Sequence, residues 1–209
     1  EVVYTPPDDY TVINALLTNF VEYLNGDEPT LAKMAIMHYQ FETIHPFHDG
    51  NGRTGRIINM LYLILKEYLD IPILYLSSYI IRNKTRYYEL LLSVTKDDAW
   101  EEWILFILKG IEEIAKDTIL KIRKIRELLD STIAIVKDTL PGIYSKELDE
   151  TLFVNPYCKG EFLVTSLGVE RKTAARYLKQ LEDSGILESV KVGTERIFIH
   201  TELIRLLKE

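Results

Sequence analysis

A run of turn-forming residues between two helical patterns constrains this chain more than any other feature. The run, His45 to Gly52, contains a proline, two glycines, an aspartate and an asparagine, so it cannot continue a helix. The preceding pattern predicts a helix over residues 30–44, and the following one predicts a helix over residues 53–68 that is apolar nearly all round and therefore buried. The chain must therefore fold so that a tight glycine loop leads into the N-terminus of a central helix.

Apolar residues recur at helical spacing in three other parts of this region, at 10–24, at 83–95 and, almost without interruption, at 99–139. The last stretch is longer than a typical globular helix. We therefore predict two helices there, with a break near Gly110 or Lys116.

Pro141 and Gly142 interrupt the helical pattern, and the pattern changes after them. Three short helical segments, at 143–153, 160–167 and 171–184, are followed by two alternating runs at 187–192 and 196–200, with a glycine turn between the runs. This order is typical of a winged helix-turn-helix. We therefore predict two domains, residues 1–140 and residues 141–209.

The net charge of −7 argues against a surface built as a whole for nucleic acid. No apolar stretch approaches the roughly 20 residues of a membrane span, so we expect no membrane contact. Cys158 is the only cysteine, which excludes an intrachain disulfide and fits a reducing cytoplasm.

The segment from His45 to Arg56 has the chemistry needed to hold a nucleoside triphosphate. A glycine loop at a helix N-terminus offers backbone N–H groups and a positive helix dipole to phosphate oxygens. Arg53 and Arg56 lie three residues apart, on one face of the first helical turn, where two guanidinium groups suit a polyphosphate. Asp49 supplies one carboxylate for Mg²⁺. His45 can serve as a base, because a histidine is partly unprotonated at neutral pH.

The twelve residues HPFHDGNGRTGR match the Fic motif HPFx[D/E]GNGRxxR at every defined position, so the chain resembles a Fic-family protein adenylyltransferase. Similarity at Tyr4–Pro7 and Arg82–Leu91 extends the resemblance to about residues 1–112. It implies an all-α Fic fold, a helical bundle with a short β-hairpin flap, here followed by a small α+β winged helix-turn-helix domain.

The resemblance implies transfer of AMP from ATP to a Ser, Thr or Tyr hydroxyl of a target protein, with release of pyrophosphate. His45 would take the hydroxyl proton and Asp49 would hold Mg²⁺. The α-phosphate would be bound by Asn51 and by the backbone of Gly50 and Gly52.

Arg53 would reach the β-phosphate and Arg56 the γ-phosphate, and Phe47 would anchor the loop in the core. Either Tyr87 or Tyr88 would line the adenine pocket. We do not expect both to do so, because adjacent helix residues point about 100° apart. A flap strand would pair with the target backbone; its residues are Val2, Val3, Tyr4 and Thr5.

We find no match to the family's inhibitory pattern [ST]xxxE[GN]. We therefore expect that the chain is cut within the flap, and that an inhibitory segment lies upstream or on a partner chain. Self-modification and a homodimer also stay open. Within the enzymes, the alternatives are removal of AMP and transfer of another nucleotide or phosphate.

The alternative outside the enzymes is a nucleotide-sensing regulator that binds DNA through the winged helix. The predicted recognition helix carries four cations, Arg171, Lys172, Arg176 and Lys179. Residues 141–209 nevertheless hold 10 Lys and Arg against 11 Asp and Glu, a poor balance for binding phosphates. This balance favours docking or dimerisation through the module at least as much as DNA binding.

Overall fold

The computed structural model describes residues 4–26 and 30–208, in which ten helices and three strands form. These elements group into two compact units, Glu1–Thr118 and Ile119–Glu209. The division falls inside the longest helix. None of the helices in the described residues is long and apolar enough to cross a membrane.

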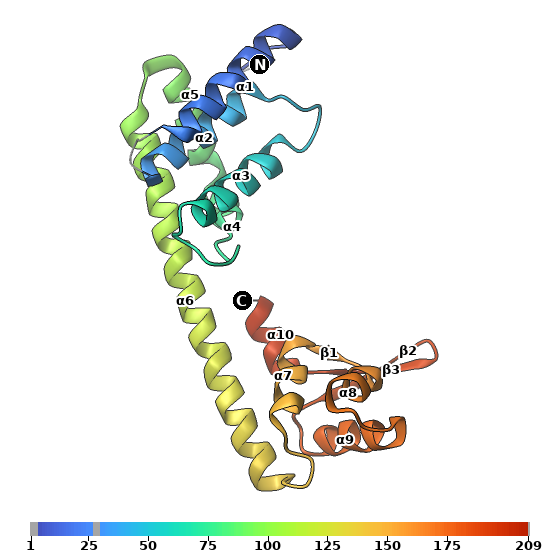
Figure 1. The fold of residues 1–209 in the computed structure, drawn as a ribbon. Coiled ribbons are helices and arrows are strands. Elements are labelled where there is room, and N and C mark those ends of the chain that lie inside the picture. Colours follow the sequence, from blue (N-terminus) through green and yellow to red (C-terminus); the bar gives the residue numbers. More distant parts are fainter. Residues whose placement is uncertain (1–3, 27–29, 209) are drawn as a thin grey trace. The chain divides into compact units, whose positions relative to one another are not determined.

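The described part of the first unit is built from helices (Figure 1). These are α1 (Tyr10–Asn25), α2 (Thr30–Ile44), α3 (Asn51–Leu65), α4 (Leu76–Arg82), α5 (Lys84–Asp97) and the beginning of α6 (Trp100–Thr139). The helices predicted at 10–24, 30–44, 53–68 and 83–95 are confirmed to within three residues at each end, and α4 was not predicted. In the predicted flap strand, Val2 and Val3 lie outside the described residues, while Tyr4 and Thr5 belong to no helix or strand.

The core of this unit is centred on Trp103, a fully buried residue of α6. Its indole N–H donates a hydrogen bond to the carbonyl oxygen of Ala35 on α2 at 2.8 Å. Its ring stacks on that of His38, also on α2, with ring centroids 6.0 Å apart. A buried indole needs a partner for its N–H, so these contacts fix α6 against α2 as well as filling the core.

The prediction that α3 is buried on all sides is wrong. One face of the helix is buried, through Asn51, Gly55, Asn59, Tyr62 and Leu63. On another face Ile57, Leu61 and Leu65, spaced four residues apart, are each more than half exposed. An apolar pattern shows that a helix could be covered, but it does not show on which sides a neighbour is present.

The predicted break in the long helical stretch is also wrong, because α6 continues through Gly110 and Lys116. A Cβ on Gly110 would lie 2.5 Å from Cδ1 of Tyr79, a residue of α4. Gly110 therefore gives the Tyr79 ring room to lie against the α6 backbone. The cost of a glycine inside a helix, about 1 kcal/mol, is offset by this packing.

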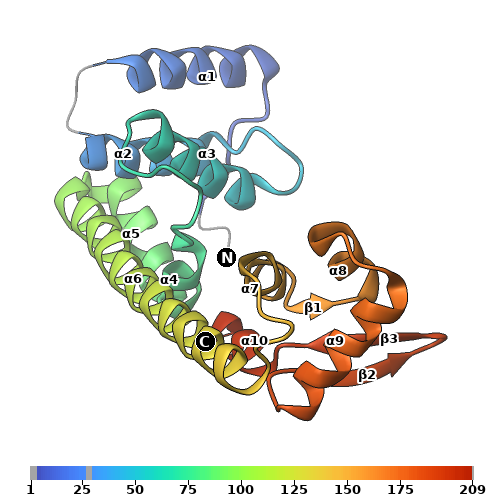
Figure 2. The ribbon, with the colours of Figure 1, turned by 60° about the horizontal axis from the view of Figure 1, so that its bottom comes forward.

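The second unit holds the rest of α6 and a small sheet covered by helices (Figure 2). Its elements are α7 (Lys146–Val154), β1 (Tyr157–Cys158), α8 (Gly160–Leu167), α9 (Arg171–Asp183), β2 (Glu188–Val192), β3 (Glu195–Ile199) and α10 (Thr201–Lys208). The strands are antiparallel in the order β1-β3-β2. The three predicted helices and the hairpin are confirmed, in the order expected for a winged helix-turn-helix. The sequence patterns gave no signal for the two-residue β1 or for α10.

The predicted domain boundary near residue 141 lies just after the end of α6, whereas the two units divide at residues 118 and 119. The difference arises because the last turns of α6 belong to the second core, where Val136 is fully buried. The same core contains Leu148, Leu152, Leu163, Leu178, Leu181 and Phe198.

We predict that Gly110→Ala destabilises the first unit by about 1–3 kcal/mol, because the added methyl group would overlap the Tyr79 ring. Urea unfolding of the purified variant measures this change. Gly142→Ala is the matched control, since no atom of another described residue lies within 4 Å of its Cβ position. Adding Tyr79→Leu should recover part of the loss. A Gly110→Ala chain as stable as the wild type would contradict the packing role of this glycine.

Candidate active site

His45 directly follows α2 and is held there by two hydrogen bonds. Its backbone N–H donates to the carbonyl oxygen of Phe41 at 3.1 Å, and its ring Nδ1 lies 3.2 Å from the carbonyl oxygen of Glu42. A carbonyl can only accept, so Nδ1 carries the hydrogen of the neutral ring. The exposed imidazole therefore presents Nε2 as its basic nitrogen.

The backbone at His45 is left-handed, with φ of 50°. A residue with a side chain adopts this conformation at a cost of about 1–2 kcal/mol and keeps it only where the surroundings impose it. Here it turns the chain sharply at the end of α2 while the ring stays bonded to the last turn of that helix.

The loop after His45 is closed by Asn51, the first residue of α3, whose side chain is buried. Its Oδ1 accepts from the backbone N–H of Phe47 at 2.9 Å, and its Nδ2 donates to the carbonyl oxygen of Phe47 at 2.6 Å. Phe47 itself is 51% exposed, with its ring 6.4 Å from that of Phe41. The expectation that the Phe47 ring anchors the loop in the core is therefore wrong, since Asn51 anchors it through the Phe47 backbone.

The N-terminus of α3 is open toward solvent. Gly50 occupies the cap position with φ of 85°, and no side chain among the described residues caps the helix. The N–H of Thr54 makes the first backbone hydrogen bond, to Gly50 at 2.9 Å. The N–H groups before Thr54 have no partner in this helix, which is the arrangement that binds anions.

Two arginines lie in the first two turns of α3. Arg53 forms an ion pair with Asp49 at 3.0 Å, but the two side chains are 72% and 90% exposed, so the pair contributes little stability and can exchange partners. Nη1 of Arg56 lies 3.0 Å from the point where a Cβ on Gly52 would be, and within the described part of the chain Arg56 makes no hydrogen bond or ion pair. The lack of a side chain at Gly52 thus leaves room for the Arg56 guanidinium.

A pocket of about 590 Å³ opens beside His45, a volume within the range of small-molecule sites. It is lined by Tyr4, Pro6, Glu42, Thr43, His45, Tyr88, Leu91, Leu92 and Thr95. The Tyr4 hydroxyl donates to the Thr43 carbonyl at 2.8 Å, which holds the segment before α1 at the pocket edge. The sequence patterns did not single out Leu91, Leu92 or Thr95, although their spacing from Tyr88 is that of one helix face.

The two adjacent tyrosines of α5 have different surroundings. Tyr88 is 57% exposed and lines the pocket, whereas Tyr87 is 4% exposed and its hydroxyl is hydrogen-bonded to Nε2 of His38 at 3.0 Å. Burial first, and the nearby Glu42 charge second, hold the pKa of Tyr87 well above its ordinary value. Of the two candidates, Tyr88 is the one that faces the pocket.

His38 is buried, as expected for a core histidine. Burial first, and Arg56 second, lower its pKa to about 3, so its ring is neutral at neutral pH. Its Nδ1 has no hydrogen-bond partner among the described residues.

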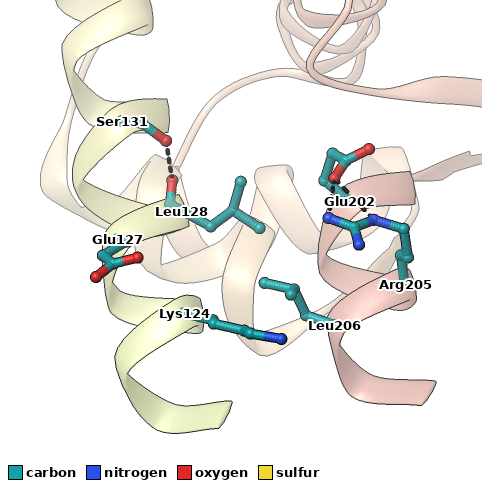
Figure 3. A pocket seen from close by; sticks show the side chains of 7 residues that line it. All are labelled: Lys124, Glu127, Leu128, Ser131, Glu202, Arg205 and Leu206. Atoms are coloured by element: carbon teal, nitrogen blue, oxygen red, sulfur yellow. Dashed lines mark hydrogen bonds and ion pairs between the residues drawn. The ribbon is translucent and has the colours of Figure 1, made fainter. Parts of the chain in front are cut away.

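A separate pocket of about 460 Å³ lies in the second unit, between α6 and α10 (Figure 3). Lys124, Glu127, Leu128 and Ser131 line it from α6, and Glu202, Arg205 and Leu206 line it from α10. Arg205 and Glu202 form an ion pair at 2.9 Å at its edge. None of the predicted site residues that the structure describes lines this pocket.

Comparison with known proteins finds matches to two family models, one in each part of the chain. Residues 1–63 match the model of the Fic/DOC family, and residues 128–203 match that of the C-terminal domain of SoFic-like protein adenylyltransferases. The first part of the chain is therefore similar to the Fic/DOC family domain. The last part is similar to the C-terminal domain of SoFic-like protein adenylyltransferases.

Individual relatives agree with this assignment. A probable protein adenylyltransferase of Aquifex aeolicus is 37% identical over 86 residues, which cover 40% of this chain and 24% of the relative. The protein adenylyltransferase fic-1 of Caenorhabditis elegans is 39% identical over 66 residues, 29% of this chain and 13% of the relative. The matched part thus spans a quarter or less of these relatives.

A solved structure supports the fold. The crystal structure of a Fic family protein from Desulfovibrio desulfuricans G20 matches with a TM-score of 0.50 at 21% identity, over 93% of this chain and 56% of that one. The predicted family resemblance and the mostly helical fold are both confirmed.

The lowered pKa of His38 makes the stability of the first unit depend on pH. The unfolded chain binds a proton near pH 6.5 and the folded chain only near pH 3, so the stabilisation is complete above pH 6.5 and is lost as pH falls toward 3. Between pH 7 and pH 5 this effect should lower the free energy of unfolding of the wild type by about 2 kcal/mol. The variant His38→Gln should not show this part of the decrease, as measured by urea unfolding at the two pH values. The exposed His48→Gln is the control, and equal losses in both variants would contradict the burial effect.

Proposed function

We propose that this chain is the catalytic part of a protein adenylyltransferase, which transfers AMP from ATP to a Ser, Thr or Tyr hydroxyl of a target protein and releases pyrophosphate. The observation that carries this proposal is the position of His45. Its Nδ1 is hydrogen-bonded to Glu42 of α2, and its Nε2 has no hydrogen-bond partner among the described residues. The residue lines a ligand-sized pocket and lies in the loop that leads to the uncapped N-terminus of α3.

In the proposed step, Nε2 of His45 accepts the proton of the target hydroxyl. The hydroxyl oxygen forms a bond to the α-phosphorus of ATP. The bond between that phosphorus and the bridging oxygen breaks, and pyrophosphate leaves with the electron pair. Catalysis of this kind depends mainly on positioning and on stabilising charge.

The phosphates would lie at the N-terminus of α3. The backbone of Gly50 and Gly52 would bind the α-phosphate, together with the backbone N–H of Asn51, because the Asn51 side chain already holds the loop. Arg53 would bind the β-phosphate and Arg56 the γ-phosphate. To bind the β-phosphate, Arg53 would give up its exposed ion pair with Asp49, because the phosphate carries more negative charge than the carboxylate.

The adenine would occupy the pocket beside His45. The exposed ring of Tyr88 offers a face for stacking, and Leu91 and Thr95 lie on the same side of α5. Tyr87 would not contact the adenine, because it is buried and its hydroxyl is hydrogen-bonded to His38.

Asp49 is the residue that would hold Mg²⁺. Within the described residues no group of three or more His, Cys, Asp or Glu side chains could bind a metal ion. One exposed carboxylate nevertheless fits Mg²⁺, which is commonly held by one or two carboxylates together with phosphate oxygens and water. When bound, the ion would neutralise charge on the phosphates.

The target would dock along the segment before α1. Of the four flap residues proposed for this contact, Tyr4 and Thr5 are described, and Tyr4 is tied to the end of α2 through Thr43. A target strand paired with this segment would lie next to the pocket that contains His45.

Incubation of the chain with ATP labelled at the α-phosphate and Mg²⁺ should attach label to the chain itself or to an added protein. His45→Ala should lower the rate by about 10²-fold or more, because it removes the base. His48→Ala, an exposed residue of the same loop, is the matched control. Full activity of His45→Ala would contradict the mechanism.

The same assay separates the related reactions. Label carried from the γ-phosphate would indicate phosphate transfer, incorporation from GTP or UTP would indicate another nucleotide, and loss of AMP from a modified protein would indicate the reverse reaction.

Binding of duplex DNA is a second candidate function, and the free cations of α9 favour it. Arg171, Lys172 and Arg176 are exposed and make no ion pair within the described part of the chain. In contrast, Lys179 is paired with Glu182 at 3.0 Å and with Asp183 at 2.8 Å. Of the four cations expected to face DNA, three are available to phosphates.

The double variant Arg171→Ala/Arg176→Ala should weaken binding to a short fluorescent duplex and reduce the slope of log affinity against log salt by about 2, as measured by anisotropy. Lys146→Ala, an exposed residue of α7, is the control. Equal binding by the wild type and the double variant would exclude α9 as the DNA-binding surface.

A further inference from the structure

The last turn of α2 carries a half-buried carboxylate that the proposed reaction does not yet use. Glu42 precedes His45 by three residues, and its side chain reaches the same pocket. Its Oε1 is buried and has no hydrogen-bond partner among the described residues. A buried carboxylate oxygen without a partner lowers stability, so the presence of Oε1 next to the proposed base needs a reason.

Two glycines of α3 make room for this carboxylate. A Cβ on Gly55 would lie 3.0 Å from Oε1 of Glu42, and a Cβ on Gly52 would lie 3.6 and 3.7 Å from its two oxygens. The carboxylate therefore lies directly against the backbone of α3, in the turn that leads to the arginines.

On the side of Glu42 that faces the candidate active site, the neighbouring groups are Arg56 and His45, which are cationic when protonated. The position that a Cβ on Gly52 would occupy is 3.0 Å from Nη1 of Arg56, and the two carboxylate oxygens of Glu42 approach the same position. Burial raises the pKa of Glu42, whereas the charges of Arg56 and His45 lower it. The carboxylate thus lies within the electrostatic reach of both the base and the arginine.

The opposite side of the carboxylate is neutral and rigid. His38 lies one helical turn earlier in α2, and its Nδ1 has no hydrogen-bond partner among the described residues. The position that a Cβ on Gly55 would occupy is 3.4 Å from this Nδ1 and 3.0 Å from Oε1 of Glu42. Its other ring nitrogen is bonded to the Tyr87 hydroxyl. Tyr87 and Trp103 both pack against the His38 ring, so the slot behind Glu42 cannot easily rearrange.

We propose that Glu42 is a positioning residue for AMP transfer, acting as the internal counter-charge for Arg56 and for the imidazolium that forms when His45 takes the hydroxyl proton. This role rests on the proposed function. Before transfer, the carboxylate orients the guanidinium toward the phosphates. During transfer, it stabilises the new positive charge on His45, which exists only after proton transfer has begun.

The test compares Glu42→Gln with the wild type in AMP transfer from ATP and in thermal unfolding at pH 8. Glutamine keeps the shape and removes the charge, so kcat should fall on the order of tenfold to a hundredfold while KM for ATP changes less than about threefold. Glu42→Asp should recover part of the rate. Glu89→Gln, an exposed carboxylate of α5, is the matched control and should leave kcat unchanged.

Stability provides the readout that separates positioning from a structural role. Because burial raises the pKa of Glu42, its ionised form costs stability above the pKa, and Glu42→Gln should unfold at the same or a higher temperature at pH 8. A variant that unfolds earlier and loses activity in proportion would overturn the proposal.

Two further outcomes are distinct. Full kcat of Glu42→Gln in an active protein would overturn the role of Glu42 alone. Absence of AMP transfer by the wild type, with every acceptor tested, would overturn the proposed function and this role with it.

Discussion

The close approach of α2 and α3 is the contact on which the candidate site depends. It is possible because Gly55 has no side chain: a Cβ there would lie 3.0 Å from Oε1 of Glu42 and 3.2 Å from Cδ1 of Phe41. The approach brings the end of one helix, where His45 stands, to the start of the next, where the unpaired N–H groups are. The proposed base and the proposed anion site thus become neighbours through the packing of two helix backbones.

Most residues of the candidate site could be predicted because they lie in one short segment. His45, Asp49, Gly50, Gly52 and Arg53 need only a turn and the beginning of a helix to come together, and local residue types determine both. The pocket could not be predicted in the same way. Tyr88 and Thr95 join it from α5, and their distance from α2 is set by packing around Trp103, which no local pattern reports.

Two errors in the predicted fold have the same cause. Gly110 suggested a break in α6 but accommodates the ring of Tyr79, and the apolar residues of α3 suggested full burial although Ile57 and Leu61 are exposed. In both cases the meaning of a residue depends on the neighbour that meets it, and that neighbour lies elsewhere in the chain. The predicted division between residues 1–140 and residues 141–209 as two domains stays a prediction.

The left-handed backbone at His45 has a practical consequence. Glycine populates this conformation freely, so His45→Gly removes the imidazole while relieving the local strain. Under the proposed function, such a chain keeps the uncapped start of α3 and the rest of the pocket lining but has no base to complete a turnover. It is therefore suited as a trap that holds nucleotide and acceptor together long enough for the acceptor to be identified.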